Sequence, residues 1–95
     1  MSKRSRPDAP SRAKDAYRVL LLNDEQTPMD FVVYILEKSF HMESHAAREL
    51  MLRVHNQGSA ECEIYSHEEA TRLVDDVIAF ARSYKHPLQC VMEKR

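Results

Sequence analysis

Three short apolar or alternating runs are separated along the chain by longer segments with helical periodicity. Residues 17–22 form a short apolar run that ends at a polar loop, and this pattern predicts a strand. Residues 60–65 alternate small or apolar with acidic side chains, which predicts a strand with one solvated face. Residues 88–92 are expected to close the chain as a last strand.

Between these runs, apolar residues recur every three or four positions, which is the spacing of an amphipathic helix. The first helix is expected to have Thr27 as its N-cap and Pro28 in its first turn, and to end near His41. The second helix is expected to start at a cap formed by Ser44 and to end near Asn56.

Gly58, the only glycine of the chain, is expected to terminate the second helix in a left-handed conformation. Ser66 and Glu69 have the spacing of a capping box, so a third helix should begin there, and Pro87 should follow its end. The resulting order is β-α-α-β-α-β. It predicts an α+β fold in which three helices cover one face of a three-stranded antiparallel sheet.

Composition fits one small domain. The chain has 95 residues, of which 43% are apolar and 31% charged. No apolar run approaches the roughly eighteen residues of a membrane helix, and the basic start lacks the apolar segment of a signal peptide, so a cytoplasmic protein without a membrane partner is expected. Cys62 and Cys90 have neither disulfide-framework nor metal-site spacing, and we expect reduced, buried thiols. No cofactor is expected.

Charge divides the chain into a basic first segment and an acidic remainder. Residues 1–16 carry five basic and two acidic side chains, and residues 17–95 carry nine and thirteen, which gives net charges of +3 and −4. Because the first segment has no apolar side chain larger than Ala after Met1, it should be a disordered extension of a domain spanning 17–95. A basic arm suits an RNA-associated module, but an acidic body repels phosphate and disfavours nucleic acid.

Asn23, Asp24 and Glu25 lie in the loop between the first strand and the first helix. They form either an ordinary polar turn or a lip for a cation, because amide and carboxylate oxygens both accept hydrogen bonds from an ammonium group. His55, near the end of the second helix, either complements the helix dipole or joins this lip. Spacing alone does not decide between these interpretations.

Four apolar residues, Met29, Val32, Met51 and Val54, are predicted near the start of the first helix and the end of the second. Such residues usually belong to the core, yet methionines also line adaptable apolar pockets. A hydrophobic hole beside an anionic lip would complement the first residue of a polypeptide, which joins a free ammonium group to a side chain.

The sequence disfavours catalysis and metal binding. His41 and His45 are four residues apart but lie on either side of the break between two helices, so no zinc site is expected. A small hydrolase that uses His55 with Asp24 would need a nucleophile, and Ser59 has no supporting motif around it.

Three separated segments resemble the ClpS family of adaptors, which hand N-degron substrates to a Clp AAA+ unfoldase. These segments are YRVLLLNDEQTPMDFV from residue 17, LMLRVHNQGSA around His55, and KHPLQCVMEK near the end of the chain. Together the resemblance covers nearly all of residues 17–94.

The resemblance implies a site for the first residue of a substrate protein. In the family, an Asn-Asp pair and a histidine bind the α-amino group, and these roles would fall to Asn23, Asp24 and His55. The implied hydrophobic pocket for a bulky side chain consists of Thr27, Met29, Val32, Met51, Val54 and Leu88. The expected ligands are polypeptides that begin with Phe, Tyr, Trp or Leu.

The resemblance also implies a macromolecular partner, the N-terminal domain of a ClpA-type unfoldase, bound by a monomeric adaptor. Glu68 matches a family position on the unfoldase-facing side of the third helix, whereas Leu73 stands where relatives often carry a lysine. Relatives carry an N-terminal extension that engages the unfoldase during delivery, and residues 1–16 are a short one. Glu25 and Gln26 replace the acid and aromatic that often follow the Asn-Asp pair.

Overall fold

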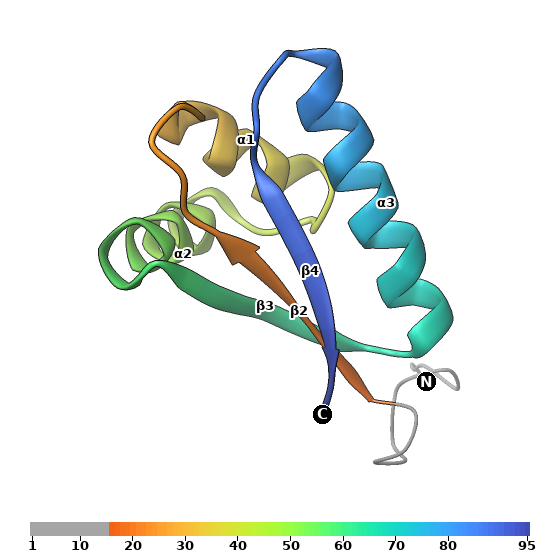
Figure 1. Ribbon diagram of the computed structural model, residues 1–95. Coiled ribbons are helices and arrows are strands. Elements are labelled where there is room, and N and C mark those ends of the chain that lie inside the picture. The colour runs from red at the N-terminus through yellow and green to blue at the C-terminus, as the bar shows by residue number, and fades with distance from the viewer. Residues whose placement is uncertain (1–15) are drawn as a thin grey trace.

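The computed structural model describes residues 16–95 (Figure 1). The expected disordered extension, residues 1–16, falls outside this range except for Ala16. Ala16 is buried, and its carbonyl accepts a hydrogen bond from the Arg95 N–H at 2.9 Å. The folded domain therefore includes Ala16, the residue just before the expected boundary.

Six elements follow one another in the described residues, in the predicted β-α-α-β-α-β order. They are β2 (Tyr17–Leu22), α1 (Met29–Lys38), α2 (Ser44–Gln57), β3 (Ser59–Tyr65), α3 (His67–Ser83) and β4 (Gln89–Lys94). The strands form one antiparallel sheet in the order β3-β2-β4, and the helices cover one of its faces (Figure 1). The predicted fold class is confirmed, although β3 starts one residue earlier and β4 runs two residues further than expected.

The central strand β2 divides its side chains between the two faces of the sheet. Val19 and Leu21 are fully buried beneath the helices, whereas Arg18 and Leu20 are only half-buried on the uncovered face. The helices complete the core with Phe31, Val32, Ile35, Leu36, Ala47, Leu50, Val54, Ala70, Val77 and Ala81.

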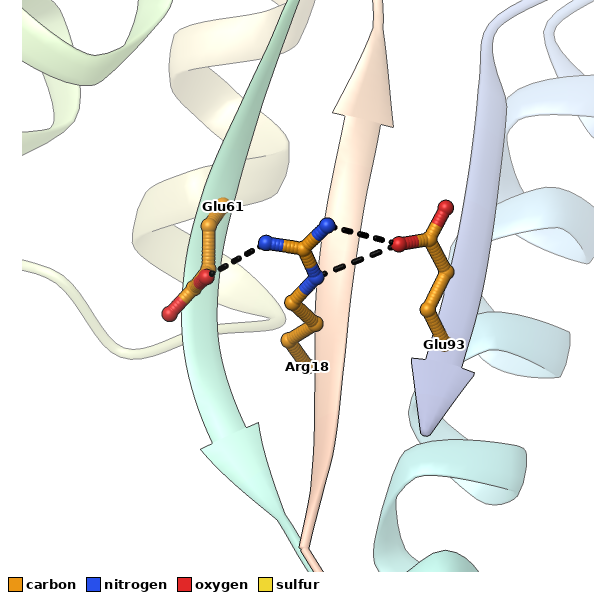
Figure 2. A network of polar contacts seen from close by, with 3 residues as sticks. All are labelled: Arg18, Glu61 and Glu93. Atoms are coloured by element: carbon orange, nitrogen blue, oxygen red, sulfur yellow. Dashed lines mark hydrogen bonds and ion pairs between the residues drawn. The ribbon is translucent and has the colours of Figure 1, made fainter. Parts of the chain in front are cut away.

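Arg18 links all three strands on the uncovered face (Figure 2). Its Nη2 and Nε donate to Glu93 Oε1 of β4 at 2.8 and 3.1 Å, and its Nη1 lies 3.5 Å from Glu61 Oε1 of β3. Hydrogen bonding to Glu93 raises the pKa of Arg18 above its usual value. Because these side chains are largely exposed, the cluster contributes more to the register of the strands than to stability.

The start of α1 differs from the sequence prediction, because its N-cap is Pro28 rather than Thr27, and no side chain of the described residues caps it. The Thr27 N–H instead donates to Asp24 Oδ1 at 2.7 Å, which draws Thr27 into the preceding turn. The Pro28 carbonyl accepts from the Phe31 and Val32 amides at 3.0 and 3.2 Å and begins the helix. The expected Thr27 cap is therefore wrong.

The junction between α1 and α2 also departs from expectation. α1 ends at Lys38, short of His41, whose φ of 59° lies in the left-handed region. The cap of α2 is Glu43, whose carboxylate accepts from a first-turn amide at 3.1 Å, and not Ser44. Ser44 is the first helical residue and donates to Glu37 Oε2 at 2.6 Å. A carboxylate one residue earlier has replaced the expected hydroxyl.

The other two helix boundary signals are confirmed. Gly58 has a φ of 91° and terminates α2 as the predicted left-handed residue. Ser66 Oγ accepts from the Glu69 N–H at 3.2 Å and caps α3. α3 ends at Ser83, ahead of Pro87 as expected.

Both cysteines are free thiols, as predicted. Cys90 is buried, and burial raises the pKa of its thiol to about 12. Cys62 is half-buried rather than buried, and desolvation raises its thiol pKa as well. Both side chains therefore stay protonated near neutral pH.

Candidate functional site

A cavity of about 250 Å³ opens between the loop after β2, the start of α1 and the end of α2. It is lined by Leu22, Asn23, Asp24, Glu25, Thr27, Met29, Val32, Met51, Val54, His55 and Leu88. The lining contains all nine residues that the resemblance assigned to amine binding and to the hydrophobic pocket. Residues from four separate parts of the chain thus meet in one hollow.

The ends of two paired strands bring the polar residues together. Leu22, the last residue of β2, pairs with Ser59, the first residue of β3. The Asn23 N–H donates to the Gly58 carbonyl at 2.8 Å, which joins the loop after β2 to the end of α2. His55 lies in the last turn of α2, and the left-handed Gly58 then turns the chain into β3. The loop and the histidine are therefore neighbours because the two strands end together.

The apolar half of the cavity combines a buried floor with an exposed rim. Val32, Val54 and Leu88, from α1, α2 and the segment before β4, are buried. Met51 is half-buried, and Met29, the first residue of α1, is 44% exposed. Met29 is thus the most exposed apolar side chain of the lining.

Asp24 uses one carboxylate oxygen to hold the loop. Oδ1 accepts from the backbone N–H groups of Gln26 and Thr27 at 2.8 and 2.7 Å. Oδ2 is buried, as is Thr27 Oγ1, and neither makes a hydrogen bond of good geometry within residues 16–95, although the Thr27 side chain lies close enough to help lower the pKa of Asp24. A buried polar oxygen left without a donor costs free energy, so Oδ2 is an acceptor ready for a ligand.

The Asp24 side chain stays ionised at neutral pH. Burial would raise the pKa of Asp24, but hydrogen bonds from Thr27 and Gln26 and the charge of His86 together outweigh it, and the pKa lies below its ordinary value. An anionic oxygen in a partly apolar cavity suits a cation that carries N–H donors.

The remaining polar lining residues lie at the surface. Asn23, Glu25 and His55 are exposed, and each borders the cavity. Glu25 adds a second acid beside Asp24. Glu25 is thus a cavity-lining residue, as its predicted place in the lip suggested, whereas Leu22 was not predicted in the site, although it directly precedes Asn23 and that adjacency was the available signal.

The predicted unfoldase contact lies apart from the cavity. Glu68 is exposed in the first turn of α3. The end of β3, just before α3, pairs with the start of β2. The cavity borders the other end of β2 (Figure 1). Leu73 is half-buried and lines a separate, polar hollow of about 260 Å³ with Arg72 and Asp76.

No helix of residues 16–95 has the length and apolar character to cross a membrane. The same residues contain no cluster of three or more His, Cys, Asp or Glu side chains that could hold a metal ion.

Comparisons with known proteins show which family the chain is similar to. The family model described as ATP-dependent Clp protease adaptor protein ClpS matches residues 12–91. The chain is 51% identical over 85 residues to ClpS 2 of Rhodopseudomonas palustris, covering 90% of this chain and 78% of that protein. It is 47% identical over 91 residues to ClpS of Brucella canis, covering 96% and 78%.

A solved structure has the same fold. Agrobacterium tumefaciens ClpS2 bound to L-phenylalaninamide matches with a TM-score of 0.84 and 28% identity, over 86% of this chain and 99% of the other. The family model and the relatives both cover most of the chain. The sequence, the fold and these matches together establish that the chain belongs to the ClpS family of ATP-dependent Clp protease adaptors.

Proposed function

We propose that the cavity binds the first residue of a polypeptide when that residue has a bulky apolar side chain. The observation that carries this proposal is that the buried Asp24 Oδ2, which makes no hydrogen bond of good geometry within residues 16–95, belongs to a residue that borders the same cavity as an apolar floor. A free α-ammonium group occurs only at the first residue, and the side chain leaves the same carbon atom. One cavity can therefore recognise both groups together.

The polar lining suits the three N–H donors of an ammonium group. Asn23 Oδ1, Asp24 Oδ2 and a ring nitrogen of His55 are the proposed acceptors, and Asp24 supplies the charge. The ligand of Agrobacterium ClpS2, L-phenylalaninamide, supports this assignment, because it has a free amine and an amide in place of the carboxylate. The first residue of a polypeptide has both features.

The size of the cavity supports a single large side chain. An apolar void of roughly 150 Å³ holds a benzene ring, and this cavity measures about 250 Å³. Phe, Tyr, Trp and Leu are the proposed first residues. Burial of a Phe or Leu side chain contributes about 1.5–3 kcal/mol, which favours such peptides over those starting with Ala or Gly by roughly ten- to a hundredfold.

Acetylation of the peptide tests the proposal directly. A fluorescent peptide that starts with Phe should bind, whereas its acetylated form should lose nearly all affinity, because acetylation removes the charge and leaves the acceptors facing an amide. A free peptide that starts with Ala is the control for the side chain. Equal affinity of the free and acetylated Phe peptides would refute the assignment.

We further propose that the protein delivers the bound polypeptide to the N-terminal domain of a ClpA-type AAA+ unfoldase, and that it acts as a cytoplasmic monomer. Family membership as a Clp protease adaptor supports this role. The exposed Glu68 at the start of α3 is the proposed contact. Glu68→Arg should weaken unfoldase binding while peptide affinity stays unchanged, as measured by separate titrations.

A further inference from the structure

A second hollow lies beside the first turn of α1. It measures about 380 Å³ and is lined by Pro28, Asp30, Phe31, Tyr34 and Tyr84, which we call the aromatic groove. With 3.6 residues per helical turn, the positions of Met29 and Val32 lie on one side of α1 and those of Asp30, Phe31 and Tyr34 on the opposite side. The groove and the cavity therefore flank the same helical turn.

Exposed apolar side chains concentrate around this turn. Within residues 16–95, the large hydrophobic residues that remain exposed are Met29 (44%), Tyr34 (42%), Leu52 (48%) and Tyr84 (56%). All except Leu52 belong to the cavity rim or to the aromatic groove. Such a local accumulation is typical of an interaction surface.

Contacts between rings hold the exposed tyrosines in place. The Phe80 ring stacks on Tyr34 and on Phe31 with centroid distances of 5.8 and 5.7 Å. Tyr84 packs against Phe80 at 5.0 Å and against Phe31 at 5.5 Å. Because the rings are already ordered, a ligand that packs on them loses little additional side-chain entropy.

His86 packs beside the aromatic groove, with its ring centroid 4.5 Å from that of Phe31 and 6.5 Å from that of Tyr84. Thr27 and Met29 line the cavity and Pro28 and Asp30 line the groove, so a chain can pass from one to the other across the start of α1. The helix is about 10–12 Å wide there, and an extended residue spans roughly 3.3–3.6 Å. About three residues after the first would therefore carry a bound chain from the cavity to the groove.

We propose that the aromatic groove binds an arginine side chain at about the fourth position of the polypeptide whose first residue occupies the cavity. This inference rests on the proposed function of the cavity. A planar guanidinium group stacks on tyrosine rings and pairs with a carboxylate, and the groove offers Tyr34, Tyr84 and Asp30. Lys38 Nζ already lies 5.8 Å from the Tyr34 centroid, so Tyr84, which is 56% exposed, is the ring on which the guanidinium group would stack.

The experiment compares labelled peptides Phe-Ser-Ser-X with a free amine, where X is Arg, Lys, Ala, Glu or Phe. Arg should bind about two- to fivefold more tightly than Ala, which is the range of an exposed cation–π contact, and Glu should bind more weakly than Ala. Equal affinities for Arg and Ala, or tightest binding of X = Phe, would overturn the proposal.

Protein variants locate the effect. Tyr84→Ala and Asp30→Asn should each reduce the preference for Arg over Ala, and Tyr84→Phe should keep it because the ring remains. Leu52→Ala is the matched control, since Leu52 is equally exposed but does not line the groove. A preference for Arg that is unchanged in both Tyr84→Ala and Asp30→Asn would place the contact elsewhere and overturn the proposal.

The same peptides separate failure of the groove from failure of the cavity. If only free peptides that start with Phe bind, and X has no effect, the groove proposal alone fails. If acetylated Phe-Ser-Ser-Arg binds as well as the free peptide, the proposed function of the cavity fails.

Discussion

At the scale of single residues, the two carboxylate oxygens of Asp24 serve different purposes. Oδ1 accepts two backbone N–H groups and holds the loop, whereas Oδ2 is buried and makes no hydrogen bond of good geometry within residues 16–95. The same side chain therefore shapes the loop and offers an anionic oxygen to a ligand. A substitution that alters only one oxygen can separate these two contributions.

Asp24→Asn should weaken binding of a Phe peptide about tenfold to a hundredfold, because it removes a charge-assisted hydrogen bond and points an amide N–H at the ammonium group. The two backbone donors fix the amide oxygen at the Oδ1 position, so the loop should persist. Peptide titration and thermal unfolding measure the two effects. Asp24→Ala, the comparison, should lose both binding and loop stability, and full affinity of Asp24→Asn would contradict the assignment.

The lowered pKa of Asp24 predicts how stability depends on pH. Its carboxylate is ionised in the folded protein at lower pH than in the unfolded chain, whose ordinary pKa is 3.8. The ionised group therefore contributes its full stabilisation above the unfolded value and loses it as the pH falls through the folded value. The stability difference between wild type and Asp24→Asn, measured by urea unfolding, should stay constant from about pH 7 to 5 and shrink below about pH 4. A difference that grows on acidification would contradict this sign.

Met29 is expected to control which side chains enter the cavity. Its exposed, unbranched side chain at the rim can pack on a flat ring or on Leu, but it would collide with a ligand branched at Cβ, whose χ1 is stiff. Wild type should therefore reject peptides that start with Ile or Val, and Met29→Ala should admit them with a smaller loss for Phe. Titration of peptides that start with Phe, Leu, Ile and Val measures this selectivity. Should the variant still exclude Ile and Val at full Phe affinity, Thr27 or Val32 becomes the better candidate.

At the scale of elements, the sequence predicted type and order better than boundaries. The Ser66 cap was predictable because no stronger acceptor competes for the Glu69 amide. The Thr27 cap failed because the bond from its N–H to Asp24 Oδ1 holds Thr27 in the preceding turn, where its Oγ1 accepts from no helix amide. Ser44 failed as a cap because the carboxylate of Glu43 accepts the bond instead. Short-range competition between neighbouring acceptors is not visible in the spacing of apolar residues.

The candidate site shows the same limit over longer range. Periodicity placed Met29, Val32, Met51 and Val54 on helices but could not say whether protein atoms fill the space between them, and only the resemblance favoured a cavity. The aromatic groove escaped prediction because Tyr84, from the end of α3, meets α1 only after the helices pack.

Gly58 provides a test at this scale, because it ends α2 and its carbonyl bonds the Asn23 N–H. Its φ is 91°, and an added Cβ would meet nothing within 4 Å, so the cost of Gly58→Ala is conformational rather than steric crowding. The variant should lose about 1–2 kcal/mol of stability in urea unfolding. Gly58→Asn is the matched control and should lose less, because Asn tolerates the left-handed region better. An equal loss in the two variants would argue against this explanation.

At the scale of the whole molecule, the two ends of the central strand β2 lie in different surroundings. The cavity is lined by Leu22, the last residue of β2, whereas the start of β2 pairs with the end of β3 that leads into α3 (Figure 1). The basic first segment and the acidic domain also carry opposite net charges. This arrangement suits a protein that holds a substrate at one end and meets a partner at the other.

Deletion of residues 2–14 should therefore separate recognition from delivery. It leaves every described residue of the cavity and of the core in place, so thermal stability and affinity for a Phe peptide should equal those of the full chain. Degradation of a substrate that starts with Phe by the unfoldase–protease complex should fall, because the deleted segment is the proposed handle for the unfoldase. Replacing residues 2–14 by a Gly-Ser segment of equal length distinguishes a need for chain length from a need for these side chains. Lost peptide affinity in the truncated protein would mean that the segment belongs to the binding site, and unchanged degradation would mean that delivery depends on the folded domain alone.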